Sequence, residues 1–225
     1  MIQKSKIFEV YEEDFGKRRY LYTENFVPGE KVYDEKLVKQ DNIEYREWNY
    51  RKSKLAAAIM KGCPNTGIRK GDIVLYLGAS TGTTSSHVSD IVGKDGFVFA
   101  LDFAPRVVRE LVFLCEKRNN MAPILADANQ PDSYKENVPE EVDVVYQDIA
   151  QRNQAEIFLK NCRQFLKKGG YGLIAVKARS VDVTKKPNDI FKQVRDQISK
   201  ELIIIDERKL DPFEMDHIFY VCKKK

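Results

Sequence analysis

The regular alternation of strand-like and helix-like segments after residue 53 is the feature that most constrains the fold. Ile73–Leu77 is a continuous apolar run, typical of a strand covered on both faces. Thr83–Val92 has a helical pattern, and residues 97–101 form the next strand-like run. Such alternation predicts a mostly parallel sheet with helices on both faces.

The same alternation continues toward the C-terminus. Further strands are expected at residues 124–126, 142–146 and 171–176. Cap and breaker residues predict helices that begin at Ser53, Pro105 and Pro187, and one through Ile157 and Phe165 that ends at Gly169-Gly170.

The last two predicted strands, residues 202–205 and 217–222, have no helix between them. They must be antiparallel neighbours, because a parallel pair needs a crossover of about a dozen residues. A mostly parallel Rossmann-like α/β sheet closed by a C-terminal antiparallel hairpin is the layout of class I methyltransferases. This layout argues against a fold of the NAD-binding type.

The first fifty residues have a different texture. Residues 7–11, 19–23, 31–34 and 44–48 mix aromatic and β-branched side chains with charge, and turn residues separate them. The turns are expected at Gly16, Pro28-Gly29 and Asp41-Asn42. We expect a small N-terminal antiparallel β domain, residues 1–52, that packs on a larger domain, residues 53–225.

Composition excludes some classes of protein. No apolar run approaches the roughly 20 residues that span a bilayer, and the N-terminus lacks a signal-peptide pattern, so we expect a cytoplasmic protein without membrane contact. The formal charge of +4 is a modest excess that suits contact with phosphates. The four cysteines lie far apart without a CxxC pair, which argues against zinc or disulfides and predicts no metal.

A glycine-containing loop follows the first strand of the predicted sheet. Gly78 and Gly82 are separated by three residues, without the middle glycine of a dinucleotide-binding fingerprint. Such a loop suits a nucleoside ligand without a phosphate chain, although a purely structural tight turn would look the same.

Three carboxylates follow successive strands of the same sheet. Asp102 ends the second strand, where it could bind both ribose hydroxyls, and Asp127 follows the third, where it could accept from an adenine amine. Asp148 follows the fourth strand. These acids predict a ligand crevice at the carboxyl edge of the sheet; the alternative is three ordinary loop or helix-capping aspartates.

Several motifs, in order and nearly end to end, resemble those of the fibrillarin family in its short archaeal form. The most specific are QDIAQ at residues 147–151 and VKARS at residues 176–180; others are WNYRKSKLAA (48–57), LYLGASTGTT (75–84), SHVSD (86–90), DFAPR (102–106) and DHIF (216–219). Asp102 stands where fibrillarins usually have Glu, which shortens the reach by one methylene, and Thr81 stands where Ser or Ala is common.

The resemblance implies a cofactor and a set of site residues. S-adenosyl-L-methionine is expected to contact Gly78, Ala79, Thr83, Thr84, Asp102, Phe103, Asp127, Ala128, Asp148, Ile149, Ala150 and Gln151. The implied catalytic residues are Lys54, Asp148 and Lys177, with His217 as a fourth candidate.

Methyl transfer to a ribose hydroxyl requires such a set of charged residues. A sulfonium donor is already activated, so the main tasks are alignment of the 2′-hydroxyl and removal of its proton. A lysine can accept that proton only if burial or a second cation lowers its pKa. Lys54 and Lys177 around Asp148 would provide this arrangement, and the sequence does not decide which lysine is the base.

The resemblance also implies a function and partners. It implies transfer of methyl groups to ribose 2′-hydroxyls of ribosomal RNA, and also of transfer RNA, inside a box C/D guide ribonucleoprotein. A Nop-type scaffold protein, a kink-turn-binding ribosomal-type protein and guide RNA paired with target RNA are the expected partners. Two alternatives remain open from the residues: a non-catalytic structural subunit, and a protein glutamine methyltransferase.

Overall fold

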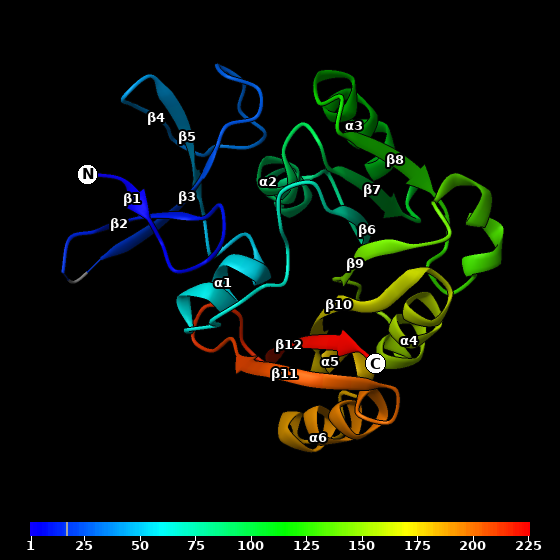
Figure 1. Cartoon of the computed structure of the whole chain (residues 1–225). Helices are drawn as coiled ribbons and strands as arrows, with labels where there is room; N and C mark the ends of the chain where they lie inside the picture. Colours follow the sequence, from blue (N-terminus) through cyan, green and yellow to red (C-terminus); the bar gives the residue numbers. More distant parts are fainter. Residues whose placement is uncertain (17) are drawn as a thin grey trace.

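The computed structural model describes residues 1–16 and 18–225, and within these residues the chain forms two sheets. The larger sheet has seven strands in the order β11-β12-β10-β9-β6-β7-β8 (Figure 1). Its strands are β6 (Ile73–Leu77), β7 (Phe97–Asp102), β8 (Met121–Leu125), β9 (Val142–Gln147), β10 (Leu166–Lys177), β11 (Leu202–Lys209) and β12 (His217–Lys224). Strands β6 to β10 pair in parallel, whereas β12 pairs antiparallel with both β10 and β11. The predicted fold class is confirmed.

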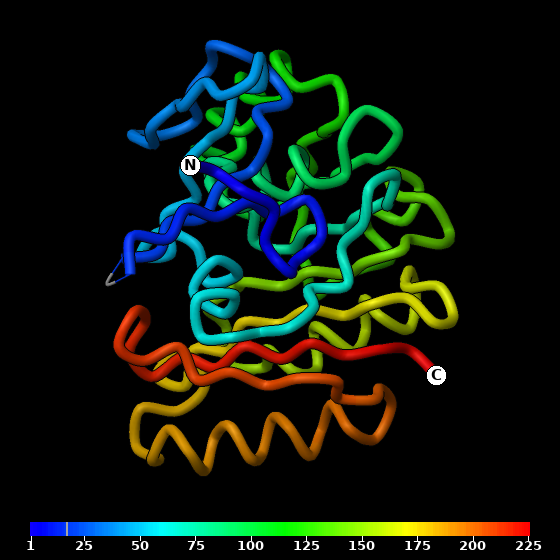
Figure 2. The backbone as a smooth tube through the Cα atoms, turned by 60° about the vertical axis from the view of Figure 1, so that its left-hand side comes forward, coloured from blue at the N-terminus to red at the C-terminus, as the bar shows by residue number. Residues whose placement is uncertain are grey.

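Helices cover both faces of this sheet. They are α1 (Lys54–Met60), α2 (Thr83–Val92), α3 (Pro105–Lys117), α4 (Gln154–Phe165), α5 (Ala178–Val181) and α6 (Pro187–Ile198). One apolar core joins one face to residues of α1, α2 and α3, and a second core joins the other face to residues of α4 and α6. Helix α6 lies with β11 and β12 at one end of the molecule (Figure 2).

The smaller sheet has the order β1-β2-β3-β5-β4, with every neighbour antiparallel. Its strands are β1 (Gln3–Lys4), β2 (Tyr11–Asp14), β3 (Arg19–Glu24), β4 (Leu37–Gln40) and β5 (Ile43–Trp48). Asp41 and Asn42 both have positive φ, at 51° and 65°, as a two-residue hairpin turn between β4 and β5 requires.

The predictions of two strands in the N-terminal region, at residues 7–11 and 31–34, are wrong for most of their residues. Residues 7–10 form a turn in which the Val10 N–H donates to the Ile7 carbonyl at 3.1 Å, and Glu9 has φ 52°. Residues 32–34 bend because the buried Glu35 carboxylate accepts the backbone N–H groups of Val32 and Tyr33. The sequence patterns missed β4 altogether.

Several boundaries in the larger domain also differ from expectation. Helix α4 ends at Phe165 instead of at the glycines, because β10 begins at Leu166 and passes an irregularity before Tyr171. Strand β8 begins at Met121 and runs through Pro123. It is an edge strand, where the missing N–H of proline is tolerated.

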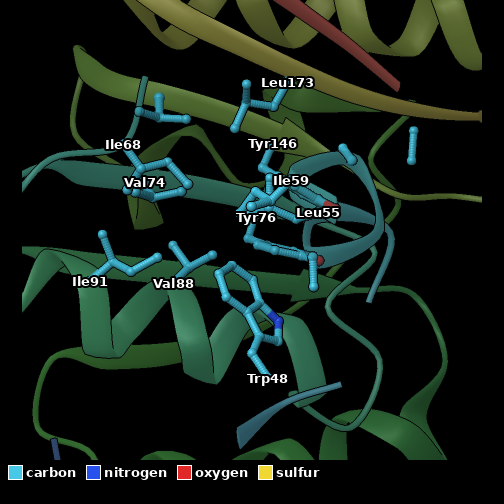
Figure 3. Packing of buried hydrophobic residues seen from close by; sticks show 14 of the residues in the cluster. Trp48, Leu55, Ile59, Ile68, Val74, Tyr76, Val88, Ile91, Tyr146 and Leu173 are labelled. Carbon is cyan, nitrogen blue, oxygen red and sulfur yellow. The ribbon is translucent and has the colours of Figure 1, made fainter. Parts of the chain in front are cut away.

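The two sheets share one apolar core. Leu21 and Trp48 from the small sheet are fully buried in the same cluster as Leu55 and Val88. Figure 3 shows Trp48 close to Val88 in this cluster. Because this core is continuous across the predicted boundary, the division into domains at residues 52 and 53 stays a prediction. In the described ranges, 1–16 and 18–225, no helix is long and apolar enough to cross a membrane.

Candidate active site

The loop after β6 needs both of its glycines. Gly78 has φ +83°, and a Cβ there would lie 2.2 Å from the backbone oxygen of Asp148. Gly82 has φ +97°, and a Cβ there would lie 2.1 Å from Leu114 on α3. The backbone N–H groups of Gly78 and Ala79 donate to the Leu101 carbonyl at 2.8 and 2.9 Å. The loop is thus pressed against the ends of β7 and β9, which a side chain at Gly78 would prevent.

Asp102, the last residue of β7, joins two loops. Its Oδ2 accepts from the Ser80 N–H at 2.9 Å, and its Oδ1 accepts from the Ala104 N–H at 3.1 Å. The residue is only 9% exposed. A carboxylate offers about four lone-pair positions, so two remain for a ligand.

A cavity of about 270 Å³ lies at this edge of the sheet. Its lining residues are Gly78, Ser80, Leu101, Asp102, Phe103, Ala126, Ala128, Asp148, Ile149, Ala150 and Gln151. Most of the cofactor-binding residues expected from the sequence are among them. Mainly apolar walls with a few polar groups, here the carboxylates of Asp102 and Asp148, are typical of a pocket for a nucleoside.

Four of the expected cofactor contacts lie outside the lining of this cavity: Ala79, Thr83, Thr84 and Asp127. The Asp127 Oδ1 accepts from the Asn129 N–H at 2.9 Å, which is the ordinary loop role that the sequence left open. Sequence reasoning missed Ser80, Leu101 and Ala126. Each is adjacent to a residue that it did select, and this adjacency was the only signal available.

Strand alternation places three expected catalytic side chains on one face of the large sheet. Leu173 and Ala175 of β10 belong to the core shared with α1, whereas Ile174 and Val176 belong to the opposite core. Because side chains alternate along a strand, Lys177 lies on the face of Leu173 and Ala175.

The same alternation applies to the neighbouring strands. His217 shares the face of Phe219 and Val221, and Asp148, directly after β9, shares the face of Val144 and Tyr146. Lys177 and His217 are also direct partners in the β10–β12 register. Helix α1, which begins at Lys54, covers this face.

Lys54 and Asp148 form an ion pair. The distance from Lys54 Nζ to Asp148 Oδ2 is 3.0 Å, and the side chains are 24% and 21% exposed. Ser53 caps α1 by accepting the Ala56 N–H at 3.3 Å, which fixes the first residue of the helix, Lys54.

The ion pair decides the protonation of Lys54. Burial acts to lower the pKa of Lys54, but the Asp148 carboxylate, with a smaller contribution from Glu214, outweighs burial and raises that pKa. Lys54 is therefore an ammonium at neutral pH. The expectation that this arrangement lowers the pKa of a lysine is wrong for Lys54, because its nearest charged neighbour is an anion.

His217 has a defined tautomer. Its Nδ1 lies 2.7 Å from the carbonyl oxygen of Met215, and a carbonyl can only accept a hydrogen bond. The neutral ring therefore carries its proton on Nδ1, and the lone pair is on Nε2. His217 thus offers a nitrogen acceptor on the face of the sheet that also carries Lys177 and Asp148.

Comparison with known proteins gives the family. The family model described as fibrillarin matches residues 1–225. The fibrillarin-like rRNA/tRNA 2′-O-methyltransferase of Methanocaldococcus jannaschii is 52% identical over 223 residues, which is 98% of this chain and 96% of that protein.

Solved structures agree with this relationship. Aeropyrum pernix fibrillarin in complex with natively bound S-adenosyl-L-methionine superimposes with a TM-score of 0.90 and 42% identity, over 99% of this chain and 97% of that chain. The chain matched in a fibrillarin/Nop5p complex gives a TM-score of 0.89 and 38% identity, over 99% and 100% of the two chains. Matches of this extent confirm what the motifs predicted: the chain belongs to the fibrillarin family.

Proposed function

We propose that this protein transfers the methyl group of S-adenosyl-L-methionine to ribose 2′-hydroxyls of ribosomal and transfer RNA. One observation carries the proposal: Asp148 both lines the nucleoside-sized cavity and binds Lys54. A single residue thus joins the cofactor pocket to the cluster of candidate catalytic side chains. The name of the M. jannaschii relative and the cofactor bound to the A. pernix protein support the same activity.

The cavity fits this cofactor in chemical terms. Asp102 has acceptor positions for the two ribose hydroxyls, and Ala126, Ala128 and Ile149 provide an apolar surface for a purine. The close approach of Gly78 to Asp148 brings the two loops together beside the same space. When bound, the cofactor supplies a methyl group already activated on a sulfonium.

The candidate catalytic residues have two different roles, to position the acceptor oxygen and to remove its proton. Asp148 fixes the position of the Lys54 ammonium, which can donate a hydrogen bond to the acceptor oxygen but cannot take its proton. We therefore assign proton removal to the Lys177–His217 pair, in which the Nε2 of His217 presents a lone pair.

The guide complex is part of the proposal. The relative bound to Nop5p supports a Nop-type scaffold as a partner of this chain. We add a kink-turn-binding protein and a box C/D guide RNA, whose pairing with the target RNA would select the nucleotide. The modest charge of +4 agrees with selection of the target by the guide RNA, since the chain alone has little electrostatic attraction to RNA. The cytoplasm is the proposed location.

The test is single-turnover methylation in a reconstituted guide complex, with the product analysed for 2′-O-methylribose. Lys177→Ala should reduce the rate by about 100-fold or more, since general acid–base groups contribute at least that much. Lys168→Ala is the matched control, because Lys168 is an exposed lysine of the same strand, near its opposite end. A rate for Lys177→Ala within about twofold of the parent would refute the catalytic assignment. Methyl groups found on glutamine instead of ribose would favour the protein-methyltransferase alternative.

A further inference from the structure

Strand β10 extends beyond its parallel neighbour. The last registered pair of β9 and β10 is Gln147 with Ile174, whereas β10 continues to Lys177. In a strand, the N–H and C=O of one residue point to the same side, and successive residues alternate sides. The Ala178 N–H donates toward β12, to the Asp216 carbonyl at 3.0 Å. The backbone groups of Lys177 therefore face the β9 side, from which the chain of β9 has already turned away.

A side-chain amide occupies the place of the missing strand. The Lys177 N–H donates to Gln154 Oε1 at 3.1 Å, and Gln154 Nε2 donates to the Lys177 carbonyl at 3.3 Å. An amide has the same donor and acceptor pair as a backbone peptide, so Gln154 satisfies both groups of Lys177 at once.

Gln154 is itself held in place. It is fully buried at the first position of α4, and its backbone carbonyl accepts from Gln147 Nε2 at 2.7 Å. Gln147 and Gln154 therefore close the loop between them, residues 148–153. That loop contains Asp148 and the other cavity residues through Gln151.

We propose that Gln154 is a positioning residue for methyl transfer, which sets the backbone of Lys177 relative to the loop of Asp148. The proposal rests on the proposed function of the site. A lysine side chain has many rotamers, so its ammonium is placed accurately only if its backbone is fixed. Gln154 fixes that backbone against the loop that lines the cofactor cavity, although Gln154 does not line the cavity itself.

The first test removes both hydrogen bonds and keeps the volume. In the reconstituted guide complex, Gln154→Met should slow single-turnover methylation by roughly tenfold or more, whereas the Kd for S-adenosylmethionine should change by less than about threefold. Gln164→Met is the matched control, since Gln164 is on the same helix and its amide contacts Asp132. A loss of cofactor affinity as large as the loss of rate would overturn the positioning role.

The second test uses Gln154→Glu, whose carboxyl resembles the amide only when protonated. The protonated acid can donate to the Lys177 carbonyl and accept from the Lys177 N–H, but the carboxylate would face the carbonyl with a second acceptor. Burial raises the pKa of such a carboxyl, so the protonated form is accessible near neutral pH. The rate of Gln154→Glu relative to the parent should therefore rise as the pH falls from about 8.5 to about 6. A ratio independent of pH would contradict the proposal.

A third measurement does not depend on activity. Hydrogen exchange of the Lys177 backbone amide in the free protein should become faster in Gln154→Met and remain at the parent rate in Gln164→Met. Unchanged exchange would overturn the assignment even if the rate of methylation fell. If the parent complex failed to methylate ribose, the proposed function would fail, whereas this measurement would still test the link between Gln154 and Lys177.

Discussion

The close approach of the glycine loop to Asp148 can be tested with two glycines that have the same φ but different space for a Cβ. Gly71 and Gly78 flank strand β6, and both have φ +83°. A Cβ at Gly71 would meet no atom within 4 Å, whereas a Cβ at Gly78 would lie 2.2 Å from the Asp148 oxygen and 2.9 Å from Ile149 Cγ2. Gly71→Ala therefore measures backbone strain alone, and Gly78→Ala measures the same strain together with a collision.

The magnitudes follow from these contacts. An L-residue in the left-handed region costs about 1–2 kcal/mol, which is the expected loss of unfolding free energy for Gly71→Ala. The collision at Gly78 involves backbone atoms of Asp148, and overpacking of this kind costs typically about 1–3 kcal/mol more. Gly78→Ala should therefore lose about 2–5 kcal/mol in total.

The same displacement should affect the site. Moving the Asp148 backbone changes both the cavity wall and the Lys54 ion pair, so Gly78→Ala should weaken S-adenosylmethionine binding by about tenfold or more, or roughly 1.4 kcal/mol. Gly71→Ala should leave this affinity within about twofold of the parent. Urea denaturation gives the unfolding free energies, and calorimetry gives the Kd values. Equal losses of stability and equal affinities in the two variants would refute this account of the loop.

Two further predictions concern charged groups at the site. Asp102→Ala should weaken S-adenosylmethionine binding by about 1–3 kcal/mol, because hydrogen bonds to a charged acceptor would be lost; unchanged affinity in calorimetry would argue against this placement of the ribose. The pKa of Lys54 is raised in the folded state by the Asp148 carboxylate, so the ion pair stabilises the protein fully below the unfolded pKa of about 10.4 and is lost as the pH rises through the folded pKa. The difference in unfolding free energy between the parent and Lys54→Met should thus be constant from about pH 7 to 9 and shrink above about pH 10.5, and a difference that stays constant in strongly alkaline solution would contradict the assignment.

The large sheet could be predicted because its signals are local. The parallel strands contain apolar runs, and three helices have a start that the sequence marks: Ser53 caps α1, Pro105 begins α3 and Pro187 begins α6. The carboxylates at the strand ends share one edge as a consequence of parallel topology. Asp102 and Asp148 both line the cavity at this edge, as the parallel topology predicts. The same topology does not explain why Asp127 lies outside the lining.

The N-terminal sheet was harder to predict because distant contacts decide it. Residues 31–34 have a strand-like composition, but Glu35 bends them by accepting two backbone N–H groups. Glu35 is buried because Arg46, eleven residues later, pairs with it at 2.9 Å. The pKa of Lys54 depends in the same way on Asp148, which is 94 residues away in the sequence. Local patterns contain no information on either pair.

The contacts of α2 explain why the small sheet matters for the site. Helix α2 begins at Thr83, directly after the glycine loop, so its position sets the position of that loop. His87 of α2 is buried between Thr23 Oγ1 at 2.8 Å and the Tyr33 hydroxyl at 2.7 Å, both from the N-terminal region. Burial, reinforced by two arginines, holds the pKa of His87 well below its usual range, so the ring is neutral and serves in packing and hydrogen bonding.

One turn further along α2, Asp90 makes the connection stronger. Its carboxylate accepts from the Thr23 hydroxyl at 2.7 Å and pairs with Arg46 at 2.9 Å and Arg118 at 2.7 Å. Removing one partner of such a buried group costs several kcal/mol, because the remaining charge is left without compensation. The N-terminal sheet thus holds the helix that follows the glycine loop. Helix α1, whose cap follows β5 within a few residues, carries Lys54, which pairs with Asp148. Without the first fifty residues, α2 would lose the hydrogen bonds and the ion pair that Thr23, Tyr33 and Arg46 make with His87 and Asp90.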